Sequence, residues 1–164
     1  MPSIACADPV ETAADKMSAF AWRALVRVRG DGNDDPTIVR HVHDLAVLET
    51  IASQDERFGP LLNETLLADS DRGHGAVADQ APGDRLEGML AKRTEDEAYE
   101  GEYSRFVEAM AFGSALPDCA AAVAALRRLP QLPAGSSARL TLLPHATVCR
   151  RTNSDSQTSF LRVL

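Results

Sequence analysis

The sequence has few aromatic residues, few cysteines and no long apolar run, and each shortage excludes a class of protein. Aromatic residues make up 5% of the 164 residues, which favours a helical core rich in alanine and leucine over a sheet. The three cysteines, Cys6, Cys119 and Cys149, are odd in number and widely separated, which argues against a disulfide framework. Because no CxxC motif or paired Cys/His spacing is present, the sequence predicts no zinc site.

Signals for export or membrane insertion are also missing. The apolar runs fall short of the roughly 18 residues that a spanning helix needs. The first residues, MPSIACADPVE, lack the basic segment followed by apolar residues that marks a secretory signal. We therefore expect a cytoplasmic protein without a membrane partner.

The formal net charge is −7, and it is unevenly distributed along the chain. Residues 1–129 hold 13 Lys or Arg against 23 Asp or Glu, a balance of −10. Residues 130–164 hold four Arg against Asp155, a balance of +3. The acidic body argues against a broad nucleic-acid-binding surface, which needs clustered cations. A small basic pocket is compatible with this balance.

Helical patterns fill residues 1–129, so the expected fold is mainly α, a helical bundle forming one domain. The first helix is expected to start at Asp8-Pro9-Val10-Glu11, with Asp8 as its N-cap, and to end before the glycine-rich turn that begins at Gly30. The expected helices span about 9–28, 37–52, 55–68, 84–96, 97–112 and 118–129.

Two stretches lack a helical pattern. Residues 69–82 are rich in Gly, Asp and Ser and are interpreted as a loop, with 71–75 as a flexible linker. Residues 130–164 are rich in Pro, Ser and Arg, and we expect a mostly disordered tail there, with room for one short strand or hairpin at 139–149.

The first expected helix carries two parallel rows of side chains. Its apolar row consists of Val10, Ala14, Met17, Ala21, Ala24 and Val28. A second row contains Lys16, Phe20, Arg23 and Arg27 and no carboxylate. Three aligned cations beside a buried face are well placed to bind an anion. Spacing alone, however, favours the plainer interpretation of a solvated basic face over the core.

The second expected helix buries Ile38, Val42 and Leu45 and carries an Arg-His-x-x-Asp cluster. Arg40 and Asp44 are four residues apart and can pair, and His41 also neighbours Asp44. This cluster is either half of a phosphate pocket or an ordinary helical salt bridge, and spacing alone favours the salt bridge. His41 and His43 point about 200° apart on a helix, so they cannot bind one metal ion together.

These two segments resemble a known family. ETAADKMSAFAWR (11–23) and DPTIVRHVHDL (35–45) are similar to the ExxAxKxxAxxxR…RxxxDL signature of the AbiEii/AbiGii nucleotidyltransferase toxins of type IV toxin–antitoxin and abortive-infection systems. EYSRFVEAMAFG (102–113) is similar to the family's late helix, and the resemblance covers roughly residues 4–129.

The resemblance implies the helical, C-terminal half of a polymerase-β-like nucleotidyltransferase. By motif, Lys16 would contact the nucleotide triphosphate, Arg23 would support it, and Asp44 would be the catalytic carboxylate. Arg40 and His41 would line the same pocket, and Arg27 extends the row of phosphate-binding cations. The complete family enzyme would use Mg²⁺ and a nucleoside triphosphate to modify an RNA acceptor such as tRNA.

One part of the family pattern is missing. The Gly-Ser and Asp-x-Asp elements that bind the metal ions should lie upstream of Lys16, where only 15 residues are present. The single Asp-x-Asp of the chain, Asp69-Ser70-Asp71, lies in the expected loop downstream. We therefore expect a truncated family member that is inactive alone and holds no cofactor by itself. The alternative is a non-catalytic helical module that binds a separate catalytic N-terminal half or an antitoxin.

Overall fold

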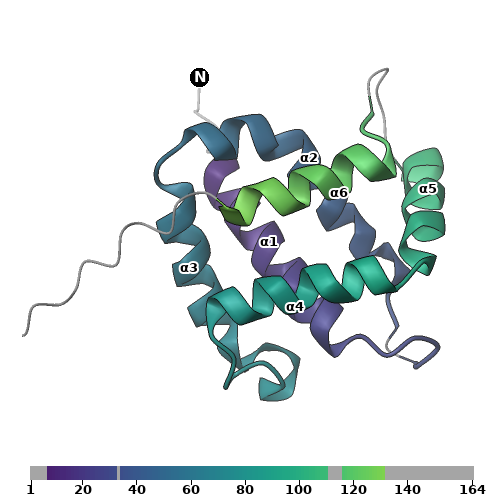
Figure 1. Cartoon of the computed structure of the whole chain (residues 1–164), viewed down its shortest axis with the longest axis horizontal. Helices are drawn as coiled ribbons and strands as arrows, with labels where there is room; N and C mark the ends of the chain where they lie inside the picture. Colours follow the sequence, from purple (N-terminus) through teal and green to yellow (C-terminus); the bar gives the residue numbers. More distant parts are fainter. Residues whose placement is uncertain (1–6, 33, 111–115, 132–164) are drawn as a thin grey trace, which may run out of the picture.

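The computed structural model describes residues 7–32, 34–110 and 116–131, and these residues are mostly helical (Figure 1). The six α-helices are α1 (Pro9–Val26), α2 (Val39–Gln54), α3 (Phe58–Ala68), α4 (Pro82–Glu95), α5 (Ala98–Met110) and α6 (Cys119–Arg128). Three short 3₁₀ segments are η1 (Pro36–Ile38), η2 (Asp69–Gly75) and η3 (Leu129–Gln131). No strand occurs within these ranges, so the predicted mainly α fold is confirmed.

Each predicted helix is present, with ends that differ by a few residues. The expected tail beyond η3, and with it the hairpin at 139–149, lies outside the described residues. The same holds for the last two residues of the helix expected at 97–112. None of the described helices is long and apolar enough to cross a membrane.

Helix α1 begins where the sequence predicts and ends two residues early. Asp8 caps its start, since the Val10 backbone N–H donates to Asp8 Oδ1 at 2.8 Å. Near the other end, Lys92 Nζ from α4 donates to the Leu25 carbonyl at 2.7 Å, which satisfies one of the last free carbonyls. Val28 therefore lies beyond the helix and is 65% exposed, so its predicted place in the apolar row is wrong.

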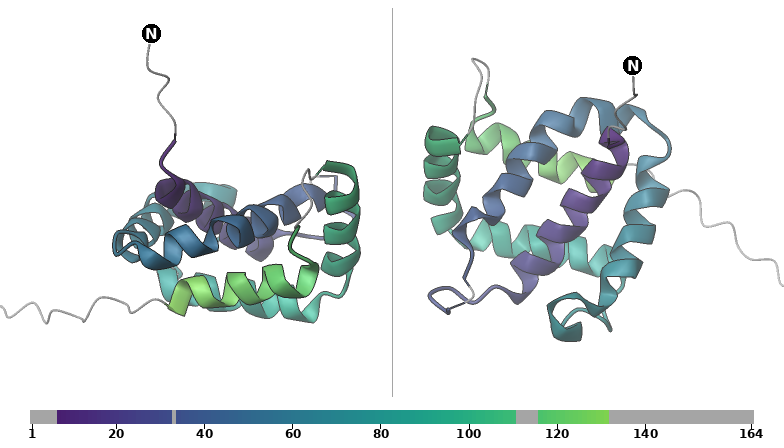
Figure 2. Two further views of the ribbon diagram at one scale, coloured as in Figure 1. Left: turned by 90° about the horizontal axis from the view of Figure 1, so that it is seen from above. Right: turned by 180° about the vertical axis from the view of Figure 1, so that it is seen from behind.

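Helix α1 lies at the centre of the bundle. It packs against α2, α3 and α4, and α2 also packs against α6. Viewed from above, α1 and α2 form one layer and α4 and α6 a second, with α5 closing one side (Figure 2). The signature segments at 11–23 and 35–45 therefore lie on neighbouring elements.

The core follows the predicted apolar rows. All residues of the first apolar row except Val28 are buried, and so are Ile38, Val42 and Leu45 of the second apolar row. Phe20, placed among the cations by spacing, is fully buried and meets the Tyr99 ring of α5 edge to face, with centroids 6.2 Å apart. The cationic row thus runs along the margin of the core.

The segment 69–75 is packed on α1, although the sequence predicts a flexible linker at 71–75. Ser18 Oγ of α1 donates to Asp69 Oδ2 at 2.8 Å. Gly73 has φ +62°, and a Cβ there would lie 3.0 Å from Val26 Cγ1, so glycine permits both the turn and the close approach. The next residue, His74, also has positive φ, at 60°. Tertiary contacts fix this loop against the helix.

Candidate functional site

Lys16 of α1 and Asp44 of α2 form one of the contacts that join the two signature segments. Lys16 Nζ donates to Asp44 Oδ2 at 2.6 Å, and about one third of each side chain is exposed. The pairing of Arg40 with Asp44 that the spacing allows does not form. Arg40 instead donates to Thr37 Oγ1 at 2.8 Å. A half-exposed ion pair contributes little stability, so Lys16 can exchange its partner at small cost.

Asp35, immediately before η1, lies close to the other two cations of the cluster, Arg23 and Arg40. Its carboxylate lies 3.6 Å from Arg23 Nη1 and 3.9 Å from Arg40 Nη2. It also caps η1 by accepting the Thr37 N–H at 2.9 Å. Partial burial opposes ionisation, but the hydrogen bonds from Thr37 and the charges of Arg40 and Arg23 lower the pKa of Asp35. Asp35 thus faces both arginines at ion-pair distance.

His41 lies behind this cluster and is 7% exposed. Neither ring nitrogen has a hydrogen-bond partner among the described residues. Burial and then the positive charges of Lys16, Arg40 and Arg23 lower the pKa of His41 to about 4, against the opposing charge of Asp44. At neutral pH the ring is therefore uncharged, and both of its nitrogens are buried.

Arg27 has a different environment, although it belongs to the same helical row. Its side chain is 5% exposed, and carboxylates contact all three guanidinium nitrogens. Two nitrogens donate to Glu102 of α5 at 2.7 and 2.9 Å, and Nε donates to Asp34 at 2.6 Å. Burial opposes the charge, but these hydrogen bonds raise the pKa of Arg27 overall. The contacts give Arg27 a structural position that ties α5 to the end of α1.

A groove of about 820 Å³ lies beside Arg23, between the end of α1 and the 69–75 segment. Trp22 and Ile38 contribute apolar surface, and Arg72 and His74 lie on the opposite wall. Sequence reasoning missed both the groove and Asp35. The Asp-Pro pair at the start of η1 was a usable signal for Asp35 as a cap, but no local pattern indicates that 69–75 folds onto α1.

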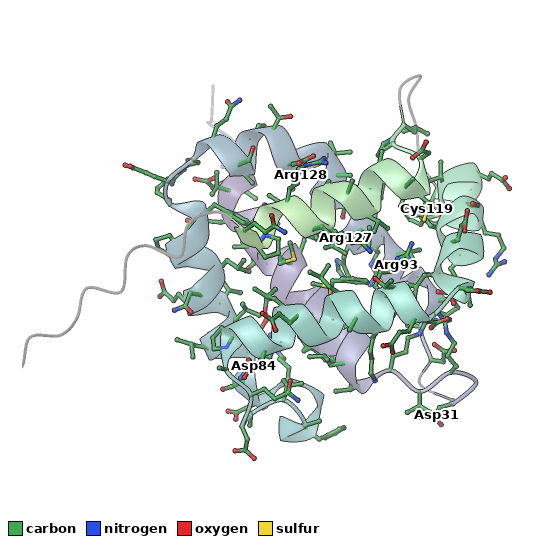
Figure 3. The ribbon with its side chains drawn as sticks, viewed as in Figure 1. Asp31, Asp84, Arg93, Cys119, Arg127 and Arg128 are labelled. Atoms are coloured by element: carbon green, nitrogen blue, oxygen red, sulfur yellow. The ribbon has the colours of Figure 1, made fainter. Side chains whose placement is uncertain are left out.

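A second group of cations lies on α4 and α6, away from the Lys16–Asp44 contact. Arg93 Nη2 lies 3.1 Å from Cys119 Sγ, and Arg127 Nη2 donates to Thr94 Oγ1 at 3.1 Å (Figure 3). Arg128 pairs with Glu49 of α2 on the same side of the bundle. These contacts join α6 to α4 and α2, and none of the buried unpartnered atoms of the described residues belongs to this group.

Among the described residues, no three His, Cys, Asp or Glu side chains lie close enough to hold a metal ion. Asp44 and Asp35 both face cations, which compete with a metal for the carboxylate oxygens. Asp69, half of the only Asp-x-Asp, accepts from Ser18 and pairs with Arg72. These residues do not fit the Mg²⁺ ion that the resemblance implies for the complete enzyme.

Comparison with known proteins places this geometry in a family. The model of the nucleotidyl transferase AbiEii toxin, type IV TA system, matches residues 1–125. The chain belongs to the AbiEii family. No curated protein and no solved structure matched it. The AbiEii match covers α1, α2 and therefore every candidate residue of the site, and it extends almost to the end of α6.

Proposed function

We propose that this AbiEii domain binds the triphosphate of a nucleotide through Lys16, Arg23 and Arg40. The contact between Lys16 and Asp44 at 2.6 Å carries the proposal, because it brings the two signature segments together at one exposed point. Asp44 and Asp35 hold the cations in place while no ligand is bound. A phosphate oxygen can then replace a carboxylate oxygen on each cation.

Asp44 is the functional carboxylate in this proposal, and His41 is an uncharged partner. Once Lys16 turns to a phosphate, Asp44 is free to orient a reacting group. The buried His41 ring lies behind the cluster and adds no positive charge to it. Transfer additionally requires the metal-binding carboxylates of a catalytic domain, which the described residues do not supply. An antitoxin partner and an RNA acceptor such as tRNA follow from the family alone.

Calorimetric titration of the chain with a nucleoside triphosphate and magnesium tests the phosphate site. We expect Lys16→Ala and Arg23→Ala each to weaken binding about tenfold, since each removes a charge-assisted hydrogen bond. Arg128→Ala is the matched control, because Arg128 lies on α6 and pairs with Glu49. Unchanged affinity in the Lys16→Ala, Arg23→Ala double variant contradicts the proposal.

Asp44→Asn separates binding from catalysis. The substitution keeps the shape of the side chain but removes the charge that holds Lys16, so we expect triphosphate affinity to rise about two- to fivefold. Nucleotide transfer by the domain combined with its catalytic part should be lost. Weaker binding by Asp44→Asn would show that Asp44 does not compete with phosphate for Lys16.

A non-catalytic docking module is the second candidate function. Val47 and Ile51 are 59% and 49% exposed and lie four residues apart on α2, so they share one face. An apolar pair of this kind favours contact with another protein. The same titration distinguishes the two functions, because a docking module alone has no affinity for triphosphate.

A further inference from the structure

The groove beside Arg23 has an apolar floor and a charged rim. Trp22, Val26 and Ile38 contribute apolar lining, and Arg72 and His74 of the 69–75 segment contribute polar lining. Asp31, Asp35 and Asp71 add carboxylates to the rim. A recess with an aromatic surface and polar groups of both kinds fits a flat ligand that has hydrogen-bonding edges.

The 69–75 segment that forms the wall of this groove is held in place by contacts with α1. The Ser18–Asp69 hydrogen bond anchors the start of the wall at 2.8 Å. At its centre a Cβ on Gly73 would lie 3.0 Å from Val26 Cγ1 and 3.4 Å from the Trp22 ring. His74 follows with a left-handed φ of 60°, which a non-glycine residue adopts only at a conformational cost. The groove is therefore largely preformed.

Arg23 connects the groove to the proposed phosphate site. Its guanidinium lies 5.1 Å from the Trp22 ring centroid, while Nη1 faces Asp35. Its Nε is buried and has no hydrogen-bond partner among the described residues. Lys16 and Trp22 are six residues apart on α1, which separates them by a rise of about 9 Å and a rotation of about 120° around the helix axis, so a nucleoside triphosphate that reaches both curves around α1 past Arg23.

We propose that Trp22 and the groove bind the nucleobase of the nucleotide whose phosphates occupy the Lys16–Arg23 cluster. The inference rests on the proposed phosphate site. The indole ring offers a stacking surface for the base, and the nearby guanidinium of Arg23 strengthens such a stack. Carboxylates on the rim, such as Asp31 and Asp71, accept hydrogen bonds from the N–H groups on the edge of the base. The phosphates then supply charge complementarity to the cations, and the base allows the protein to discriminate between nucleotides.

The fluorescence of Trp22 provides a direct readout, since Trp22 is the only tryptophan in the sequence. We compare a nucleoside triphosphate with ribose 5-triphosphate, which has the same phosphates and sugar without the base. The nucleoside triphosphate should quench the fluorescence of the full chain, and ribose 5-triphosphate should not. Excess ribose 5-triphosphate should reverse the quenching by competing for the phosphate site.

Substitutions at Trp22 test the stack by calorimetry. Trp22→Ala should weaken nucleoside triphosphate binding about tenfold and leave ribose 5-triphosphate affinity unchanged. Trp22→Phe keeps an aromatic surface and should retain affinity within about twofold. Leu67→Ala, at an exposed apolar position on α3, is the matched control. Circular dichroism confirms folding, and the wild-type quenching decides the question if Trp22→Ala does not fold.

These experiments distinguish failure of the nucleobase site from failure of the phosphate site. Equal affinity of the wild-type chain for the two ligands, without quenching by either, overturns the nucleobase site and leaves the phosphate site standing. If folded Trp22→Ala binds the nucleoside triphosphate as tightly as the wild type does, the nucleobase site is likewise overturned. If neither ligand binds the wild-type chain, both the proposed function and this inference fail.

Discussion

At the scale of single residues, partner carboxylates decide what each cation of α1 can do. The side chains of Lys16 and Arg23 are 31% and 34% exposed and each faces one carboxylate, so a phosphate can approach them. Arg27 is 5% exposed and lies between Glu102 and Asp34. Releasing it would leave charges buried without partners, which costs several kcal/mol. The proposed phosphate binding therefore falls to Lys16 and Arg23, and Arg27 contributes to stability.

His41 should make stability depend on pH between about 6.5 and 4. Its pKa is 6.5 in the unfolded chain and about 4 in the folded one, so only the unfolded state takes up a proton in this window. The free energy of unfolding should therefore fall as pH falls from 6.5 to 4, by up to about 3 kcal/mol. Urea unfolding at several pH values measures the slope.

The variant His41→Leu removes this titration and should flatten the slope. Leucine suits the site because neither ring nitrogen of His41 has a partner to lose among the described residues. His74→Asn is the control, since His74 is exposed and asparagine tolerates its positive φ. Equal slopes for the wild type and His41→Leu would mean that His41 does not carry the pH dependence.

The row of cations could be predicted from the sequence, because helical periodicity is a local property. Their partners could not. Asp44 lies 28 residues from Lys16, and Glu102 lies 75 residues from Arg27. Only the packing of α2 and α5 on α1 brings these carboxylates to the row. For the same reason, spacing alone paired Arg40 with Asp44, whereas the fold gives Asp44 to Lys16.

At the scale of elements, a network of charged residues joins α5 to the end of α1 and the loop that follows. Arg27 and Arg29 both donate to Glu102, and Arg29 also pairs with Asp96 at 2.6 Å. The Tyr99 ring lies 4.8 Å from the guanidinium of Arg29. These contacts hold the loop that leads from Lys16 and Arg23 toward Asp35.

Glu102→Gln should destabilise the protein by about 3 kcal/mol, because it leaves Arg27 buried with less compensating charge. Glu49→Gln is the matched control. Glu49 pairs with Arg128, whose side chain is 59% exposed, so that substitution should cost less than about 1 kcal/mol. Chemical denaturation followed by circular dichroism measures both. Equal losses would show that burial does not distinguish the two ion pairs.

The amino-acid composition of residues 71–75 predicts a flexible linker, whereas the structure packs this segment on α1. Gly, Asp and Ser are typical of loops, and 69–75 is indeed irregular. Its position depends on Gly73 fitting against Val26 and on Asp69 accepting from Ser18. Both contacts are tertiary. The apolar periods of α1, α2 and α3, in contrast, are long enough to fix their helices from sequence alone.

At the scale of the whole molecule, α1 carries both the core and the site. One side of it packs against α2, α3 and α4, and its margin holds Lys16 and Arg23. Against a net charge of −7, the proposed anion site would be confined to this margin. Stability and the proposed binding would then be linked through one helix.

Because the described helices share one core around α1, we expect them to unfold together in a single transition. Phe20→Ala should lower the stability of all of them, by about 3 to 5 kcal/mol, since Phe20 is fully buried and contacts Tyr99 of α5. Val47→Ala, at a position 59% exposed, should cost less than about 0.5 kcal/mol. Thermal unfolding is followed by far-ultraviolet circular dichroism and by Trp22 fluorescence. Two separate transitions in Phe20→Ala would mean that α1 does not unite the bundle, and the site would then be able to unfold locally.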